Sequence, residues 1–243
     1  MALFVLVHGA WQTALTWELV AARLREYGHE VVVPLLSGLE NDEDHLSPSI
    51  TLRTHIRDVV EVFTRENLTD VTLVGHSYAG MIITGVAEQV VQRLNRLVYV
   101  DAFIPDDGQS ALSLLPSAVA AAFRKTAETA GRGWLLPAGE SQLDMWGLKP
   151  GDARDFVRSC MSDFSLHCFD ESVTLPTNAA SKVQRTFIAC VAEDYPARPI
   201  FQQFGDRAKS EGWTYHELPT GHDCYVEFPE AFISKLLARS ATA

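Results

Sequence analysis

The stretch from Val71 to Gly80 constrains the fold of this chain more than any other part of the sequence. Its first four residues are apolar or β-branched, as in a strand that is covered on both faces of a parallel sheet. Residues 81–87 can continue as a helix. The stretch therefore predicts a strand, a sharp turn with Ser77 at its apex, and a helix whose first N–H groups point toward the serine hydroxyl.

The residues around Ser77 fit such a turn with one departure. Strand and helix pass closely there, so small residues are needed two positions before and two positions after the serine. Gly75 meets this need, and Ala79 stands where the usual pattern has a second glycine. An ordinary strand-to-helix turn can also carry a serine, so a nucleophilic Ser77 requires a base and an acid elsewhere in the chain.

Strand-like and helix-like segments alternate on both sides of this stretch, which predicts a parallel sheet covered by helices. The strands are expected at residues 3–7, 31–33, 71–74, 97–100, 186–191 and 213–218, and the flanking helices at 17–27, 51–65, 199–209 and 229–238. After residue 105, alanine-rich and aromatic segments follow without a clear strand. We expect an α/β fold: a doubly wound, mostly parallel sheet from residues 1–105 and 185–243, with a helical cap insertion at 106–184.

Composition narrows the partners that this chain can have. Its 243 residues can bury a large core, and a net charge of −11 disfavours nucleic acid and anionic membranes. The first residues show no basic leader, and their apolar run is too short for a signal peptide or a membrane span. We therefore expect a cytoplasmic protein that acts on a small molecule. The oligomeric state is left open.

The cysteines and histidines lack the spacings of structural or metal sites. The four cysteines show no C-x-x-C pair and are expected to be reduced thiols. The eight histidines show no H-E-x-x-H motif or other paired ligand spacing. We expect neither a metal nor another cofactor.

A serine nucleophile needs a neighbouring base, and the base needs an orienting acid. Ser77, Asp194 and His222 each follow a predicted strand, in that order, at the sheet edge where such folds place their sites. His222 lies in a Gly-His turn before the last helix, which favours its interpretation as the base. Asp194 follows the strand that normally supplies the acid. Glu193 beside it and Asp101 at the end of an earlier strand are the alternatives.

Attack on a carbonyl creates an oxyanion, which requires preorganised N–H donors. The N–H of Tyr78, directly after the serine, is the expected first donor. The second donor is expected in the loop after the first strand, where we assign the N–H of Ala10. His8 is interpreted as a structural histidine that braces this loop.

Aromatic and apolar side chains suggest a pocket between the cap and the sheet. The substrate-binding candidates are Trp11, Phe123, Trp134, Met145, Trp146 and Phe164. Such a lining suits a small apolar or aromatic ester. The alternative interpretation is that these residues mainly pack the cap onto the sheet.

Four short segments carry a resemblance to a known family: Leu6–Trp11, Val74–Ser77, Asp101–Pro105 and Gly221–His222. They resemble the α/β-hydrolase superfamily and, more narrowly, its small capped branch of plant methylesterases, hydroxynitrile lyases and similar bacterial esterases. The resemblance covers residues 2–105 and 185–238. It implies hydrolysis of a carboxylic ester through an acyl-serine intermediate. It also extends to bacterial hydrolases of carbamate esters such as carbendazim.

The resemblance leaves two alternatives to a serine esterase. One is a carbon–carbon lyase of the hydroxynitrile lyase type; a group of these lyases has a threonine after the loop histidine and a lysine after the triad histidine. This chain has Gly9 and Asp223 at those positions, and both departures favour the hydrolase. The other alternative, a triad-bearing small-molecule receptor with slow turnover, would have the same sequence pattern.

Overall fold

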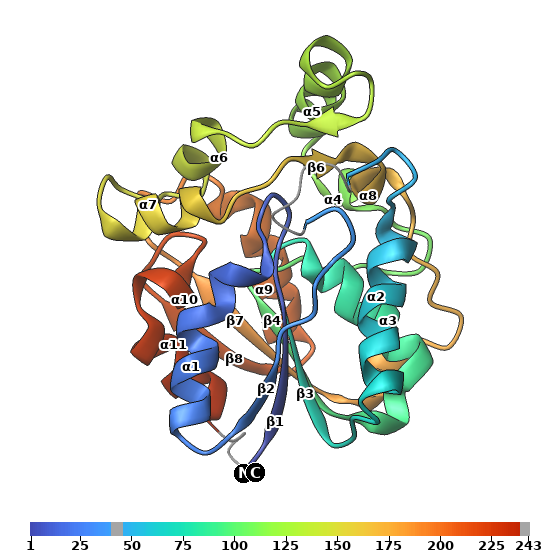
Figure 1. The fold of residues 1–243 in the computed structure, drawn as a ribbon, viewed down its shortest axis with the longest axis vertical. Coiled ribbons are helices and arrows are strands. Elements are labelled where there is room, and N and C mark those ends of the chain that lie inside the picture. Colours follow the sequence, from blue (N-terminus) through green and yellow to red (C-terminus); the bar gives the residue numbers. More distant parts are fainter. Residues whose placement is uncertain (40–45, 239–243) are drawn as a thin grey trace.

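A parallel sheet with helices on both faces forms the centre of the molecule (Figure 1). The computed structural model describes residues 1–39 and 46–238. Six strands join in the order β2-β1-β3-β4-β7-β8, and every neighbouring pair is parallel. They are β1 (Leu3–Val7), β2 (Glu30–Val32), β3 (Val71–His76), β4 (Leu94–Val100), β7 (Gln184–Cys190) and β8 (Thr214–Leu218). The predicted doubly wound parallel sheet is confirmed.

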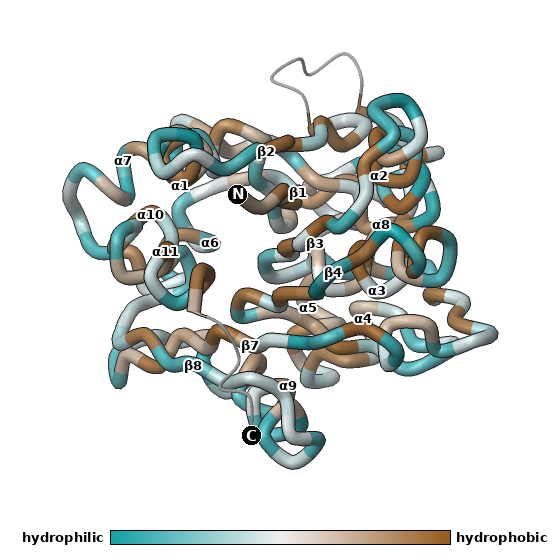
Figure 2. Tube along the Cα trace, turned by 90° about the horizontal axis from the view of Figure 1, so that it is seen from below, coloured by the Kyte–Doolittle hydropathy of each residue, from teal (hydrophilic) through white to brown (hydrophobic). Residues whose placement is uncertain are grey.

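The helices that flank the sheet begin and end near the expected residues. They are α1 (Glu18–Glu26), α2 (Leu52–Arg65), α3 (Ala79–Val90), α9 (Arg198–Ser210), α10 (Cys224–Glu227) and α11 (Pro229–Leu237), with 3₁₀ turns at Ala14–Trp17 and Val91–Arg93. Figure 2 shows α1 and α11 on one side of the sheet and α2 and α3 on the other. Of the helices in residues 1–39 and 46–238, none combines the length and hydrophobicity that crossing a membrane requires.

The strand β3 lies in the middle of the sheet and ends directly before Ser77. All six of its residues are buried, because β1 and β4 pair with its two edges and helices cover its faces. A central strand of this kind favours the β-branched, apolar sequence that β3 has. Its carboxyl end points toward the segment above the sheet (Figure 1).

The segment between β4 and β7 leaves the sheet and forms short helices above the carboxyl ends of the strands (Figure 1). These are α4 (Ala111–Leu114), α5 (Ser117–Ala130), α6 (Glu140–Met145), α7 (Asp152–Ser159) and α8 (Leu166–Asp170), followed by a 3₁₀ turn at Ala179–Lys182. Two short strands, β5 (Leu135–Leu136) and β6 (Phe164–Ser165), pair antiparallel within it. The sequence predicted no clear strand here, because two residues carry too little pattern to detect.

The predicted division into a core at 1–105 and 185–243 and a cap at 106–184 stays a prediction. Residues 40–45 and 239–243 of the core lie outside the described residues. The described part shows where the chain leaves and rejoins the sheet, after Val100 and at Gln184.

Gly80 permits the closest backbone approach near the serine. A Cβ at this position would lie 2.0 Å from the carbonyl oxygen of Phe103, in the chain that leaves β4. We expect Gly80→Ala to lower the free energy of unfolding by about 2 to 3 kcal/mol, because only a backbone shift relieves the clash. Urea denaturation measures this loss.

The control for this prediction is Gly139→Ala. The nearest atom to a Cβ at Gly139 is 3.8 Å away, and φ is 178°, which any residue adopts. This variant should stay within about 1 kcal/mol of the wild type, the range for loss of a glycine N-cap. Equal stability of the two variants would contradict the contact between Gly80 and Phe103.

Candidate active site

Ser77 lies at the apex of the turn between β3 and α3. Its φ of 56° is in the left-handed region, which costs a non-glycine residue roughly 1–3 kcal/mol. Backbone hydrogen bonds hold this conformation: the N–H of Ser77 donates to Val100, and its carbonyl oxygen accepts from Gly80 and Phe103. The turn therefore presents the serine hydroxyl at the carboxyl end of the central strand, as predicted from the sequence.

Two glycines let other backbone segments pass close to the serine. A Cβ at Gly75 would lie 2.8 Å from the carbonyl oxygen of Ala79, and a Cβ at Gly9 would lie 3.0 Å from the Cβ of Ser77. Ala79 itself is fully buried, so the extra methyl group at this departure from the usual pattern is accommodated. The loop after β1 consequently lies against the serine.

The predicted oxyanion donors come from the loop after β1 and from the residue directly after Ser77. Ala10 belongs to the loop after β1, and Tyr78 directly precedes α3; both residues are buried. Among the described residues, no acceptor takes up the N–H of Ala10 or of Tyr78. An N–H group without an acceptor in the protein can donate to an incoming oxygen. The assignment stays a prediction.

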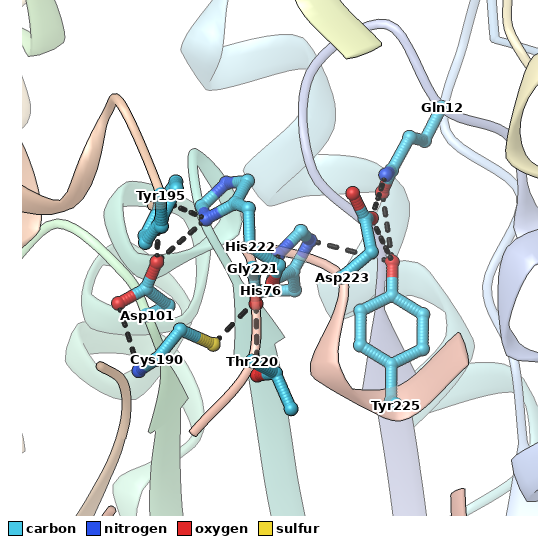
Figure 3. A network of polar contacts seen from close by, with 10 residues as sticks. All are labelled: Gln12, His76, Asp101, Cys190, Tyr195, Thr220, Gly221, His222, Asp223 and Tyr225. Atoms are coloured by element: carbon cyan, nitrogen blue, oxygen red, sulfur yellow. Dashed lines mark hydrogen bonds and ion pairs between the residues drawn. The ribbon is translucent and has the colours of Figure 1, made fainter. Parts of the chain in front are cut away.

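His222 is held by backbone contacts in the turn after β8. Its N–H donates to the carbonyl oxygen of Trp146 at 2.9 Å, and its own carbonyl oxygen accepts from Nε2 of His76 at 3.1 Å. Its Nδ1 lies 2.7 Å from Oδ2 of Asp101 (Figure 3). A carboxylate only accepts hydrogen bonds, so Nδ1 carries the proton and Nε2 keeps its lone pair. Ser77 and His222 line the same pocket.

Asp101, at the end of β4, occupies the place beside His222 that the sequence analysis assigned to Asp194. That assignment is wrong. The side chain of Asp194 is 68% exposed and lies 2.8 Å from Nζ of Lys149, whose hydrogen bond lowers the pKa of Asp194. The loop after β7 presents Glu193 and Asp194 to solvent, so neither carboxylate is turned toward the histidine.

Burial acts in opposite directions on the two members of the Asp101–His222 pair. It lowers the pKa of His222, which favours the neutral imidazole. It raises the pKa of Asp101, and hydrogen bonds from the Tyr195 hydroxyl and the Cys190 N–H oppose that rise. A neutral imidazole backed by a hydrogen-bonded carboxylate is the state that a general base requires.

The sequence analysis did not consider Tyr195, which contacts both Asp101 and His222. Its buried hydroxyl lies 2.8 Å from Oδ2 of Asp101 and 2.8 Å from Nδ1 of His222 (Figure 3). The signal that could have identified it is its position directly after Asp194, at the carboxyl end of a strand. This position alone does not show which way the side chain turns. Tyrosine is also not a usual member of a catalytic triad.

A second buried network joins the loops that carry the site. Nε2 of Gln12 donates to Oδ1 of Asp223 at 2.5 Å, and the hydroxyl of Tyr225 donates to Oε1 of Gln12 at 2.9 Å (Figure 3). The same hydroxyl lies 3.4 Å from Nδ1 of His76. Gln12 lies in the loop after β1 that also contains Ala10, His76 directly precedes Ser77, and Asp223 directly follows His222. The network therefore connects the three loops through the neighbours of the predicted site residues.

The carboxyl group of Asp223 should make stability depend on pH. Burial raises its pKa to about 7 from an ordinary 3.8, so the folded protein binds this proton more strongly than the unfolded chain. The resulting stabilisation is present at low pH and is lost as the pH rises to the folded pKa. Asp223→Asn stays neutral, so the unfolding free energy of the variant relative to wild type should rise by about 2 kcal/mol from about pH 5 to about pH 8.

Urea denaturation at both pH values measures this difference for Asp223→Asn. Glu128→Gln, which removes one negative charge from an exposed position, controls for net charge. A relative stability of Asp223→Asn that does not change with pH would contradict a buried, titrating Asp223.

An apolar pocket opens onto Ser77 and His222. Four of the six predicted substrate-binding residues line it: Trp11, Phe123, Met145 and Trp146. Phe164 is fully buried behind Trp11 at a ring distance of 5.6 Å, and Trp134 is not among the lining residues. The sequence analysis missed seven others: Phe103, Leu115, Val119, Phe169, Ala197, Ile200 and Phe201. Within residues 1–39 and 46–238, no acidic, lysine or arginine side chain lines this pocket.

Comparison with known proteins relates most of the chain to hydrolases. Residues 4–235 match the protein family described as "Alpha/beta hydrolase family". A carbendazim hydrolyzing esterase from Nocardioides sp. (strain SG-4G) is 36% identical over 98% of this chain and 99% of that protein. Methylesterase 8 from Arabidopsis thaliana is 30% identical over 44% of this chain and 40% of its own length.

A solved structure shows the same fold. An extracellular alpha/beta-hydrolase from a Paenibacillus species superposes with a TM-score of 0.86 at 23% sequence identity, covering 98% of each chain. Together with the sequence matches, this confirms the resemblance that the four short segments indicated.

Proposed function

Because this chain belongs to the alpha/beta hydrolase family and is an esterase-type hydrolase, we propose that it cleaves a small, neutral carboxylic or carbamic ester through an acyl-serine. The observation that carries this proposal is the buried contact between Asp101 and His222, because His222 lines the same apolar pocket as Ser77. This arrangement supports Ser77 as the nucleophile, His222 as the base and Asp101 as the orienting acid.

In the proposed first half-reaction, Oγ of Ser77 attacks the carbonyl carbon while Nε2 of His222 takes the hydroxyl proton. Asp101 holds Nδ1–H and stabilises the imidazolium that forms. The oxyanion accepts hydrogen bonds from the N–H groups of Ala10 and Tyr78. The imidazolium then protonates the leaving oxygen, the C–O bond breaks, and the acyl group stays on the serine.

The second half-reaction releases the acyl group. Water gives a proton to Nε2 of His222 and attacks the acyl-serine, and the oxyanion returns to the same N–H donors. Collapse of this intermediate frees the acid and returns the proton to Oγ of Ser77. A carbamate follows the same steps through a carbamoyl-serine and releases a carbamic acid.

The pocket supports an apolar or aromatic substrate. The rings of Phe123 and Phe169 are stacked, with centroids 5.6 Å apart and planes at 8°, and Trp11 meets both edge-on. A charged substrate would lose its hydration here without an opposite charge in the lining. A neutral aromatic ester fits, and a methyl carbamate such as carbendazim, the substrate in the name of the Nocardioides relative, is a specific candidate.

The chain's own residues give a hydroxynitrile lyase less support. Asp223 stands where a group of these lyases has a lysine, and its buried carboxyl group is held by Gln12. Gly9 stands where they have a threonine, and a Cβ at this position would crowd Ser77. Release of cyanide from a cyanohydrin would restore this alternative.

The test is release of p-nitrophenol from short-chain acyl esters, together with covalent labelling by a fluorophosphonate. We expect steady turnover, and a label on Ser77 that peptide mass spectrometry identifies. Labelling without turnover on these esters or on carbendazim would favour a triad-bearing receptor. The absence of both turnover and labelling would contradict the proposed function.

A further inference from the structure

The hydroxyl of Tyr195 completes a triangle of polar atoms with Asp101 and His222 (Figure 3). It lies 2.8 Å from both Oδ2 of Asp101 and Nδ1 of His222, and these two atoms are 2.7 Å apart. All three residues are at most 3% exposed. We propose that Tyr195 is a positioning residue, which locks the carboxylate against the imidazole and keeps Asp101 ionised. This inference rests on the proposed function.

Asp101 has few hydrogen-bond donors around it, so the hydroxyl of Tyr195 contributes strongly to keeping its carboxylate ionised. Oδ2 accepts from Nδ1–H of His222 and from the hydroxyl of Tyr195, and Oδ1 lies 3.3 Å from the N–H of Cys190. In residues 1–39 and 46–238, no lysine or arginine forms an ion pair with this carboxylate. A buried carboxylate without a cation depends on donated hydrogen bonds to stay ionised, and charge-assisted bonds are the stronger ones.

Tyr195 reaches the pair from a different strand than either partner. Asp101 follows β4, His222 follows β8, and Tyr195 follows β7, which lies between them in the sheet. The ring of Tyr195 stacks on the imidazole, with centroids 5.8 Å apart and planes at 27°. Gly147 leaves room for this placement, because a Cβ there would lie 3.3 Å from Cα of Tyr195. The hydroxyl therefore cross-links two loops that the sheet itself does not join.

The other titratable groups around the pair do not replace this donor. Burial raises the pKa of the thiols of Cys190 and Cys224 and raises the pKa of Asp223 to about 7. His76, with its ring 4.4 Å from that of His222, has its pKa lowered by burial. Burial also raises the pKa of Tyr195, so its hydroxyl keeps its proton and remains a donor at every pH of the kinetic assay.

Tyr195→Phe tests the inference, because it keeps the ring and removes the hydroxyl. The carboxylate then protonates more readily, so the acid limb of the pH profile of kcat/KM for a p-nitrophenyl ester should move upward by about one pH unit. At the optimum, kcat should fall on the order of tenfold with KM nearly unchanged.

Tyr99→Phe is the matched control. It removes another buried hydroxyl, which lies 2.9 Å from Oγ1 of Thr84 in α3; neither Tyr99 nor Thr84 lines the pocket that Ser77 lines. This variant should lose stability without a shift of the pH profile. If Tyr195 only supported the fold, Tyr195→Phe would also lose stability without a shift of the pH profile.

A double variant shows whether the hydroxyl acts through Asp101. The rate of fluorophosphonate labelling should fall in Tyr195→Phe, but adding Tyr195→Phe to Asp101→Asn should change it little further. A wild-type pH profile in Tyr195→Phe, or an equal effect in both backgrounds, would overturn the inference. Wild-type protein with neither turnover nor labelling would instead overturn the proposed function.

Discussion

Ser77→Ala is expected to lower kcat for ester hydrolysis by on the order of 10⁶, the loss typical of removing a triad nucleophile. The variant retains the pocket and the predicted N–H donors, so a small residual rate over water should remain. The left-handed φ of 56° at this position is equally unfavourable for serine and alanine, so the free energy of unfolding should change little. Steady-state kinetics with a p-nitrophenyl ester and labelling by a fluorophosphonate measure the effect.

The control is Ser210→Ala, at an exposed serine whose hydroxyl bonds to the backbone at the end of α9. It should keep the wild-type rate and the wild-type labelling. Ser77→Ala protein that remains folded, retains more than a few per cent of the activity and still reacts with the probe would show that another group is the nucleophile.

Asp101→Asn is expected to lower kcat by about 10⁴, whereas Asp194→Asn should change it less than about threefold. An asparagine at 101 can turn its amide N–H₂ toward Nδ1 of His222, which moves the imidazole proton to Nε2 and removes the base. Asp194 has an exposed ion pair with Lys149, whose loss matters little. The same chemical change at two positions thus separates the acid predicted from the sequence, Asp194, from the carboxylate that contacts His222, Asp101.

Both variants should be checked for folding by urea denaturation before their kinetics are compared. A large loss of kcat in folded Asp194→Asn, with a near-normal rate in Asp101→Asn, would overturn the assignment of Asp101. Equal, small effects would mean that His222 works without an orienting carboxylate.

Local features of the sequence were enough to locate the strand, the turn and two candidate site residues, Ser77 and His222, which line one pocket. The β-branched run before Ser77 and the small residues around it specify a buried strand and a tight turn over a few neighbouring positions. The turn that contains His222 is equally local. Gly28 adopts a φ of 81° just after α1, at the position after a helix where glycine is common.

The sequence predicted only part of the pocket lining. Trp11 and Trp146 are large apolar residues in segments that the sequence placed near the site, and both line the pocket. Phe201 belongs to α9, whose helical pattern indicates that it packs against the sheet but not that it reaches the serine. Which face of a helix or cap segment meets the cavity depends on how these elements pack together.

Only the tertiary structure shows which carboxylate contacts His222 and that Tyr195 contacts both residues. Asp101 and Asp194 both follow strands, and the sequence offers equal chemistry at both positions. At Asp101, a φ of 42° and an N–H bonded to Ile188 at 2.8 Å accompany a side chain that meets His222. After β7 the chain turns Asp194 to solvent and Tyr195 inward. Side-chain direction in a loop depends on backbone angles and contacts far apart in the chain, which no local pattern encodes.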